Sequence, residues 1–389
     1  MDPVTPGKYV EEIARGPAPI ALVETAATAF VDVFTRGPTS RAVRVDSWLS
    51  FEQQFGGLDA RSEASYAVRQ FFGNGGRIAW IVRVPSDRPR HVWHRDRAAA
   101  LTTALSRLGR DTAQTIGLLC VPAAAMLDQA GHTTVVRAAT ACARAHRAMV
   151  LVDPRTDETV GSVAAWLLRY EPLRSADAVL YLPRVIVRDP LDGDRPRACG
   201  ASGTMAGLYA RTDLQRGVWR APAGTDATLR GVDGFAEDVP DGVNSTLNAA
   251  GVNALRRFPT HGLVAWGART LDGSDARGSD YKYIPVRRTA LAIEASLVRG
   301  LAWTLFEEND EPLWARIRLA VGDFMHTLFR GGAFQGAAPH DAYFVKCDRS
   351  TTTDADIARG VVTLLVGFAI LRPAEFVVLS LQLRTSAAG

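Results

Sequence analysis

The sequence predicts a protein of mixed α/β and α+β class with two domains. Strand-like and helical patterns alternate at short intervals from about residue 97 to residue 187, which is typical of a parallel or mostly parallel sheet. The longest helical pattern lies later, at 285–309, and strand patterns follow it. With 389 residues, of which 47% are hydrophobic, the chain is long enough to bury the cores of two domains.

The first element is a short strand-like arm. Residues 5–13 read TPGKYVEEI and stand between a Pro-Gly break and the segment ARGPAP, so flexible joints bound the arm on both sides. Tyr9 and Ile13 share a face with Glu11, so the arm lacks the clean alternation that would assign its register. The sequence then predicts a strand-like segment over 19–34, helices over 47–58 and 62–76, and a strand over 77–84.

The second half of the chain contains a loop-rich region and then the long helices. Residues 189–258 are rich in Gly, Asp and Pro, and we expect long loops with one helix near 204–214. A new domain is expected to begin near 259. It should hold a strand and turn over 262–271, helices over 285–309 and 311–332, and strands over 342–346, 360–368 and 374–383.

The last of these strands has the clearest alternation of apolar and polar residues. Such alternation predicts a strand that is buried on one face, and this one lies just beyond Pro373. Val377, Leu379, Leu381 and Leu383 fall on one face, and Ser380 and Gln382 fall on the other.

Composition and charge argue against nucleic-acid and membrane partners. Lys and Arg exceed Asp and Glu by only 45 − 41 = 4, and the arginines are scattered, whereas a polyanion-binding groove would gather them in a stripe. The longest apolar run, at 361–371, is about half of the roughly 20 residues that a membrane-spanning helix needs. The N-terminus lacks the basic patch and apolar core of a secretory signal.

No motif in the sequence predicts a cofactor or a metal. Its four cysteines have neither CxxC spacing nor a ladder of histidines nearby, so neither a zinc site nor a disulfide framework is expected, and synthesis in the cytoplasm fits. The segment GASGTMAG (200–207) matches neither common phosphate-loop spacing, and we interpret it as a loop leading into a helix.

Two acidic features could carry chemistry. Asp153 ends the predicted strand MVLVDP, where α/β enzymes often place a metal-binding or nucleophilic carboxylate. Capping of the next helix is the competing interpretation. The second feature is an acidic cluster between two predicted helices, which is either a helix start before Pro312 or a surface that contacts a tube or another partner protein. Its members are Glu307, Glu308, Asp310 and Glu311.

Several stretches with rare residues at fixed spacing make the chain similar to the contractile tail sheath family, found in phages with contractile tails and in phage-tail-like injection systems. The resemblance runs over most of the chain, but residues 85–200 carry little of it. The most specific stretches are TPGKYVEEI (5–13), SWLSFEQQFGGL (47–58), AVRQFFGNGGRIAWIVRV (67–84) and YKYIPVRRTALAIEASLVRGLAWTLFEENDEPLW (281–314).

The resemblance implies an outward-facing α/β domain inserted into a conserved sheath domain, which is formed by the C-terminal region and both chain ends. It also implies that terminal strands are exchanged between subunits, linking sixfold rings into a helical sleeve around an inner tube, with baseplate and cap proteins at the ends. The expected division is an N-terminal linking arm (1–20), an outer α/β domain (21–258), an inner sheath domain (259–372) and a C-terminal linking arm (373–389).

The residues of the two arms and of the receiving sheet follow from this implied architecture. The arms would add strands to the sheets of neighbouring copies, because an exposed strand edge offers unpaired backbone groups. The arm residues are Tyr9, Val10, Ile13, Phe376, Val377, Val378, Leu379 and Leu381, and the receiving residues are Tyr343, Phe344, Val345, Val361 and Val362.

The expected function is therefore that of a structural sheath subunit and not of an enzyme. A chain of 389 residues leaves little room for the extra outward domains of some phage sheaths, which favours an injection system over the alternative, a phage virion sheath. A soluble α/β enzyme that uses Asp153 is the remaining alternative. The particle would assemble in the cytoplasm, stay there or be released, and require no cofactor.

Overall fold

The structure, a computed structural model, describes residues 18–85, 90–108, 115–372 and 374–385, with the side chains of residues 90–96 outside that description. Packing divides the chain into a larger unit, Leu22–Ala295, and a smaller unit, Met1–Ala21 with Ser296–Gly389. The sequence placed a boundary near 259. The packing boundary lies later because strand β11 (Gly262–Ala265) pairs with β10 (Asn253–Phe258) at one edge of the large sheet.

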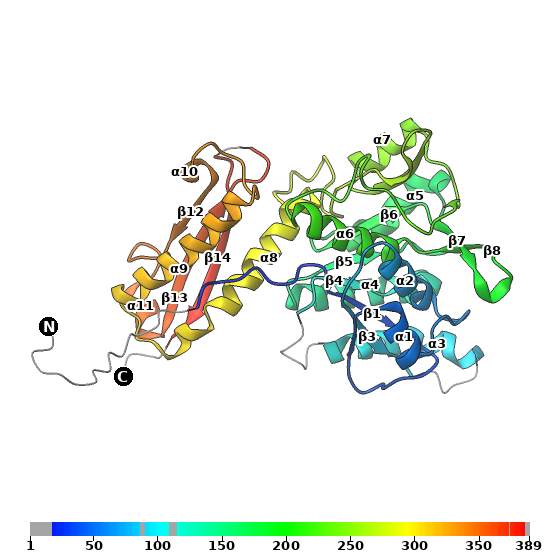
Figure 1. Cartoon of the computed structure of the whole chain (residues 1–389), viewed down its shortest axis with the longest axis horizontal. Coiled ribbons are helices and arrows are strands. Elements are labelled where there is room, and N and C mark those ends of the chain that lie inside the picture. The colour runs from blue at the N-terminus through cyan, green and yellow to red at the C-terminus, as the bar shows by residue number, and fades with distance from the viewer. Residues whose placement is uncertain (1–17, 86–89, 109–114, 373, 386–389) are drawn as a thin grey trace, which may run out of the picture. The chain divides into compact units, whose positions relative to one another are not determined.

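The larger unit is built on a mostly parallel sheet, as the alternating pattern predicted (Figure 1). In the described residues its strand order is β11-β10-β6-β5-β4-β1-β3-β2, and every neighbouring pair is parallel except β10 with β11 and β2 with β3. The strands not yet bounded are β1 (Thr28–Asp32), β2 (Val43–Val45), β3 (Ala79–Arg83), β4 (Leu118–Cys120), β5 (Met149–Val152) and β6 (Ala178–Leu182).

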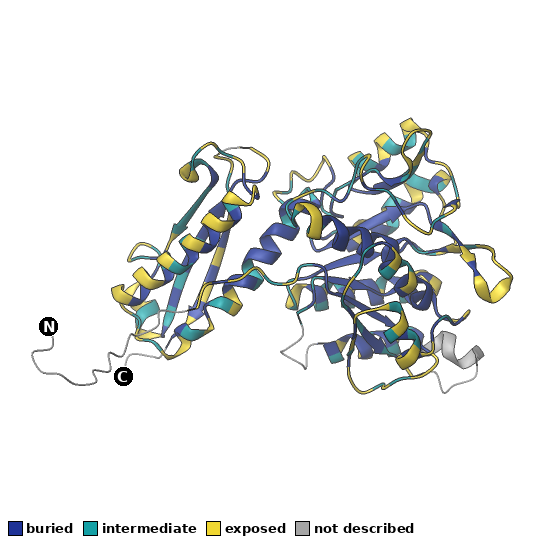
Figure 2. Cartoon of the chain, in the orientation of Figure 1, coloured by how far each residue is buried: buried dark blue, intermediate teal, exposed yellow. Residues whose placement is uncertain are grey.

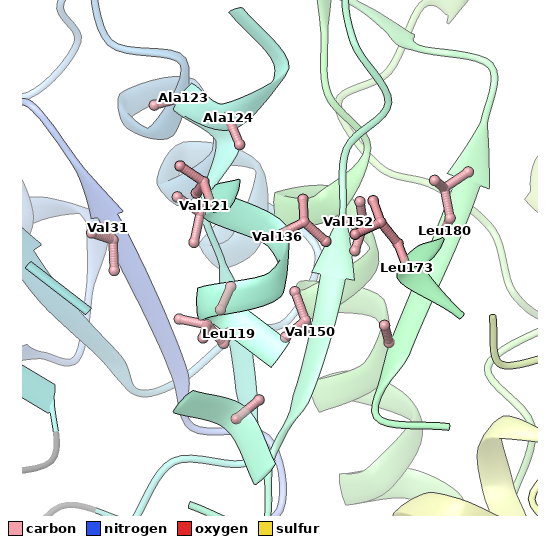
Figure 3. Close-up of a cluster of buried hydrophobic side chains, with 14 of the residues drawn as sticks. Val31, Leu119, Val121, Ala123, Ala124, Val136, Val150, Val152, Leu173 and Leu180 are labelled. Carbon is pink, nitrogen blue, oxygen red and sulfur yellow. The ribbon is translucent and has the colours of Figure 1, made fainter. Parts of the chain in front are cut away.

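Both faces of this sheet are buried, so its strands are continuous apolar runs. Successive side chains of β5 alternate between two cores: Val150 and Val152 lie in one, and Met149 and Leu151 in the other. Figure 3 shows the first core, where Val150 lies near Leu119 of β4 and Val136 of a covering helix. Figure 2 shows the strands as the most uniformly buried part of the unit.

The first two helices of the larger unit begin at local capping signals in the sequence. Ser47 and Ser62 cap the first two helices, each accepting a hydrogen bond from the backbone N–H three residues on. Gly56 ends the first helix with a positive φ of 96°, which favours glycine. The helices are α1 (Trp48–Phe55), α2 (Glu63–Gly73), α3 (Arg90–Leu108), α4 (Gln129–Ala145), α5 (Val163–Tyr170), α6 (Ser202–Arg216) and α7 (Asp241–Ala249).

The region 189–258 holds more regular structure than the sequence predicted. The expected helix is present as α6, but β8 (Arg195–Cys199), which forms a hairpin with β7 (Val185–Asp189), a short β9 (Gly234–Phe235), α7 and β10 were missed. The β8 segment reads RPRAC and is mostly exposed, so it has no apolar alternation by which it could be recognised. Short 3₁₀ turns fill other connections, at Pro122–Met126, Val160–Ser162, Glu171–Leu173 and Pro190–Asp192.

The smaller unit consists of helices against a three-stranded antiparallel sheet (Figure 1). The described strands are β12 (Tyr343–Lys346), β13 (Val361–Phe368) and β14 (Val377–Arg384), in the order β12-β13-β14. The long helix α9 (Glu311–Arg330) buries its apolar stripe, including Ile317, Val321 and Phe324. Two short helices, α10 (Pro339–Ala342) and α11 (Asp354–Ala358), precede β12 and β13.

Helix α8 (Ile284–Gly300) runs from the larger into the smaller unit, and a 3₁₀ turn at Ala302–Phe306 follows it. The predicted helix 285–309 therefore ends earlier than expected. Ile284–Phe306 is, among the described residues, the one helical segment with the length and apolar composition to cross a membrane. Val286, Ile293 and Leu297 are buried inside the protein, which accounts equally well for that composition.

Candidate functional site

The three-stranded sheet of the smaller unit holds most of the residues that the sequence singled out. Within the strand patterns at 342–346 and 360–368, the sequence placed the receiving strands at 343–346 and 361–368, and β12 and β13 have the latter bounds. All five predicted receiving residues lie on these strands. Tyr343, Phe344 and Val345 belong to β12, and Val361 and Val362 begin β13.

The last strand has the two faces that its alternation predicted. Leu379, Leu381 and Leu383 are buried, and Ser380 and Gln382 between them are exposed. On β13 the residues opposite the buried ones are also buried, so one face of the sheet forms the core of the unit. The other face carries Phe344 packed against Phe376, with ring centroids 5.3 Å apart.

The C-terminal strand does not leave its subunit in this structure of a single chain. We expected Val377, Val378, Leu379 and Leu381 to pair with a neighbouring copy, but all of β14 pairs with β13 of the same chain, from Phe368↔Val377 to Val361↔Arg384. The physical reason is proximity: a short connection returns the strand to its own sheet, where its apolar stripe is buried. Exchange of this strand between copies stays a prediction.

The N-terminal arm residues Tyr9, Val10 and Ile13 lie outside the described residues. The described chain begins next to its own helix, because Ile20 is nearly buried and packs on Gly300 at the end of α8. A Cβ atom at position 300 would lie 2.8 Å from two carbons of the Ile20 side chain, so glycine is needed for this approach. The root of the arm is thereby held in the smaller unit.

The outer edge of β14 is long, and its backbone groups face away from the sheet. Thr363 of β13 donates its N–H to the Thr352 hydroxyl, 3.1 Å away, so the odd-numbered residues of β13 face away from β14 and the even-numbered residues face it. By the register, the backbone N–H and C=O groups of Leu379, Leu381 and Leu383 then point toward β13. The outward-facing N–H and C=O groups belong to Val378, Ser380, Gln382 and Arg384, and no described residue forms a backbone hydrogen bond with them.

The opposite edge is partly closed by side chains. Val361 extends beyond the end of β12, and its C=O accepts a hydrogen bond from Asn309 Nδ2 at 3.0 Å. On the same side, the Thr352 hydroxyl accepts a hydrogen bond from the Thr363 N–H. The predicted receiving residues Val361 and Val362 therefore border a capped edge. On this side, the outward N–H and C=O groups of Tyr343 and Val345 form no backbone hydrogen bond with a described residue. Sequence reasoning missed Asn309 and Thr352, because contacts across 52 and 11 residues leave no local signal.

The acidic cluster makes mainly internal contacts, in agreement with the capping interpretation. Asp310 is the N-cap of α9 and accepts a hydrogen bond from the Leu313 N–H at 2.9 Å. Glu307 pairs with Arg316, and Glu311 pairs with Arg318 at 2.6 Å. Glu308 is exposed. Contact of these residues with a tube or another partner stays a prediction.

Asp153 is closed off from solvent. It is 4% exposed, and it accepts hydrogen bonds from the Ser202 hydroxyl at 2.5 Å and the Ser202 N–H at 2.9 Å. Burial raises the pKa of its carboxyl, although the Ser202 hydrogen bonds oppose that shift. Asp153 thus caps the start of α6, not the helix that follows it in sequence. The described residues contain no group of three or more His, Cys, Asp or Glu side chains that could hold a metal.

The glycine-rich segment 200–207 is mostly helix, where the sequence suggested a loop before the helix. Ser202 to Gly207 form the first turns of α6. A Cβ atom on Gly203 would lie 2.2 Å from the Ala67 carbonyl oxygen, and one on Gly207 would lie 2.4 Å from that of Phe71. The glycines therefore permit the close crossing of α6 and α2.

Comparisons with known proteins agree with this arrangement. The family model "Phage tail sheath C-terminal domain" matches residues 276–384. The tail sheath protein of Vibrio phage KVP40 is 26% identical over 173 residues, which are 42% of this chain and 25% of that protein, so the match spans a quarter of that relative's length.

Two solved structures match nearly the whole chain. The PVC sheath complex of an extracellular contractile injection system, in its contracted state, is 26% identical with a TM-score of 0.74, covering 97% of both chains. The helical sheath of the anti-feeding prophage, also contracted, is 30% identical with a TM-score of 0.74, covering 97% of this chain and 98% of that chain. Because an identity of this level extends over almost the full length of both chains, the chain belongs to the contractile tail sheath protein family.

Proposed function

We propose that this chain is the structural subunit of a contractile sheath that polymerises as a helical sleeve around an inner tube. Contraction of the sleeve would drive the tube through a target envelope. The full-length similarity to two injection-system sheaths supports this function. Its subunits would form sixfold rings, meet baseplate and cap proteins at the ends, and assemble in the cytoplasm.

The observation that carries the proposal is the outer edge of β14, with which no described residue forms a backbone hydrogen bond. Eight strand residues at about 3.4 Å each present an edge of about 27 Å, and an exposed edge of this length pairs readily with another chain. The N-terminal arm TPGKYVEEI of a neighbouring copy has a matching length. Strand addition would supply main-chain hydrogen bonds for affinity and side-chain pockets for register.

One repeated contact of this kind is sufficient to build a tube. A head-to-tail contact between identical copies that does not close into a ring continues as a helix. The arm is rooted at Ile20, and twenty extended residues reach roughly 65 Å at about 3.3 Å each, which spans the distance to an adjacent subunit. Energy for contraction would be stored during assembly in an extended sleeve that is kinetically trapped above a more compact one.

The particle is proposed to be a phage-tail-like injection system. The anti-feeding prophage and PVC sheaths match over 97–98% of their lengths, whereas the match to the Vibrio phage sheath covers 25% of that protein. A phage virion sheath is the alternative. Neighbouring genes distinguish the two, because a capsid gene would favour a phage and an AAA-type ATPase gene without a capsid gene would favour an injection system.

A proline substitution on β14 tests the proposal directly. The N–H of Ser380 points outward, so Ser380→Pro removes one outer donor and leaves the β13–β14 ladder intact. Ser380→Ala keeps that N–H and is the matched control. We expect both variants to fold, with the wild-type circular dichroism spectrum, and only Ser380→Pro to lose long tubes in negative-stain electron micrographs.

Deletion of residues 1–20 removes the other partner of the proposed contact. The truncated chain should remain a folded monomer and form no long tubes. Regular tubes from the truncated chain, or from Ser380→Pro at wild-type yield, would reject strand addition at β14 as the assembly contact.

A further inference from the structure

A surface cavity of about 290 Å³ in the larger unit is lined by positive charge from three separate segments. Arg69 comes from α2, Arg188 from β7, and Arg230 from the loop that precedes β9. Tyr66 and Gln70 of α2 also line it. At about 30 Å³ for each water in the liquid, this volume corresponds to roughly ten water molecules, enough for a small hydrated anion.

The cavity has more positive than negative charge. Arg188 is paired with Asp233, the acidic residue of the lining, at 2.9 Å. Arg69 and Arg230 have no carboxylate partner among the residues that the structure describes. Two arginines without a carboxylate partner in the described part of the chain therefore line the same cavity, and guanidinium groups bind carboxylate and phosphate oxygens with two parallel hydrogen bonds.

A third arginine, Arg211, has no carboxylate partner among the described residues and lies close enough to Arg230 to be repelled by it. The side chain of Arg211 is 8% exposed, and its guanidinium donates to two neutral acceptors, the carbonyls of Asn74 at 3.2 Å and Thr228 at 2.5 Å. Burial, followed by repulsion from Arg230, lowers the pKa of Arg211. A buried cation without a counter-ion is costly, and an anion near Arg230 would offset that cost.

The loop that carries Arg230 is held in place before any ligand binds. The side chain of Asn74, a fully buried residue, accepts from the Arg230 N–H at 2.8 Å and donates to the Arg230 carbonyl at 2.9 Å. Gln70 donates to the Gly231 carbonyl at 3.0 Å. Because these amides fix the loop against α2, binding of an anion would order little more than the arginine side chains.

We propose that this cavity is an oxyanion site, in which Arg69 and Arg230 bind one carboxylate or phosphate group. The group could be a carboxylate side chain of a second copy of this chain, a source that rests on the proposed sheath function. It could also be free phosphate, which does not depend on that function. The two sources give different results in the experiments below.

The first experiment measures the Tm of the full chain in sodium phosphate and in sodium chloride of equal ionic strength. The variant is Arg69→Gln/Arg230→Gln. The control is Arg41→Gln/Arg44→Gln, which removes two exposed arginines that line no described cavity and have no carboxylate partner among the described residues. If free phosphate is the ligand, it should raise the Tm of wild type and control by about 2–4 °C and leave the cavity variant unchanged.

In chloride alone, the cavity variant should be at least as stable as wild type, because it removes the repulsion between Arg230 and Arg211. The sign of this stability difference in chloride separates loss of a ligand from damage to the fold, because a damaged fold would make the variant less stable than wild type.

The second experiment compares tube formation in phosphate-free buffer. If the ligand is a carboxylate of a neighbouring copy, the cavity variant should stay folded and lose tubes, while wild type and control form them. A rise in Tm in phosphate that the cavity variant lacks assigns the site to free phosphate. Loss of tubes in the cavity variant alone, with no such rise in Tm, assigns the site to a carboxylate of the second copy. Equal phosphate responses together with equal tube formation would overturn the proposal. If wild type forms no tubes, the sheath function fails and the phosphate result alone decides.

Discussion

Arg288 and Asp213 form a two-bond ion pair in the interior of the larger unit. Arg288 Nη1 lies 2.7 Å from Oδ1 and Nη2 lies 2.7 Å from Oδ2 of Asp213, and the arginine side chain is 3% exposed. Arg288 also donates to the Thr25 carbonyl at 3.0 Å and lies over the ring of Tyr209. The pair therefore joins the start of α8 to α6 and to the segment before β1.

Removing one member of this pair should destabilise the larger unit strongly. Arg288→Met leaves the Asp213 carboxylate poorly paired, with an expected loss of about 3–5 kcal/mol in the free energy of unfolding. The double variant Arg288→Met/Asp213→Leu removes both charges and should lose less than the single variant. Urea unfolding followed by fluorescence measures both, and equal losses would contradict an ion pair that acts as a unit.

The same glycine-to-alanine change should have opposite effects in two helices. Gly207→Ala places a Cβ atom 2.4 Å from the Phe71 carbonyl oxygen and should destabilise by roughly 1–3 kcal/mol. A Cβ atom at Gly322 in α9 would meet nothing within 4 Å apart from the adjacent residues and backbone of its own helix, so Gly322→Ala should stabilise by up to about 1 kcal/mol through helix propensity. Thermal and urea unfolding provide the comparison. A loss at both positions would show that open space at 322 does not exist in solution.

The stability of the larger unit should depend on the proton of Asp153. Burial raises the pKa of this carboxyl in the folded chain, despite the hydrogen bonds from Ser202 and the charge of Arg184, and Glu63 raises it further. A raised folded pKa means that the contribution is fully present below the unfolded pKa, near pH 4, and is lost as pH rises through the folded value. The Asp153→Asn variant has no titrating carboxyl at this position, so its stability does not fall with rising pH for this reason.

The unfolding free energy of Asp153→Asn should therefore increase relative to wild type as pH rises from about 4 towards 7. Asp46→Asn, at an exposed position, is the matched control for removing a carboxylate. A difference for Asp153→Asn that shrinks with rising pH would contradict the direction of the shift.

The position of the last strand in the isolated subunit can be tested by a core truncation. Leu381 is buried on β14, so Leu381→Ala should destabilise the monomer by about 2–5 kcal/mol. Gln382→Ala, on the exposed face of the same strand, should change stability by no more than about 0.5 kcal/mol. If Leu381→Ala leaves the monomer unchanged but reduces tube formation, the strand is packed only after exchange with another copy.

Local patterns predicted much of this protein because they depend on neighbours in sequence. The serines at 47 and 62 cap helices, and β12 and β13 have their expected bounds, since capping residues and β-branched runs act within a few residues. The alternation of the last strand correctly predicted that Leu379, Leu381 and Leu383 are buried, whereas Val377 on the same face is half-buried. The rare-residue stretches were sufficient to indicate the family.

The three-dimensional structure decided the features that depend on residues far apart in the chain. Asp153 meets Ser202 across 49 positions, Asn309 caps Val361 across 52, and Asn74 holds Arg230 across 156. The sequence predicted a strand over 374–383, and the structure has it at Val377–Arg384, but the edge to which that strand returns was not predicted, because a strand's own pattern specifies its faces and not its partner. Periodicity determines local structure, whereas pairing and burial of charge are set by packing of the whole chain.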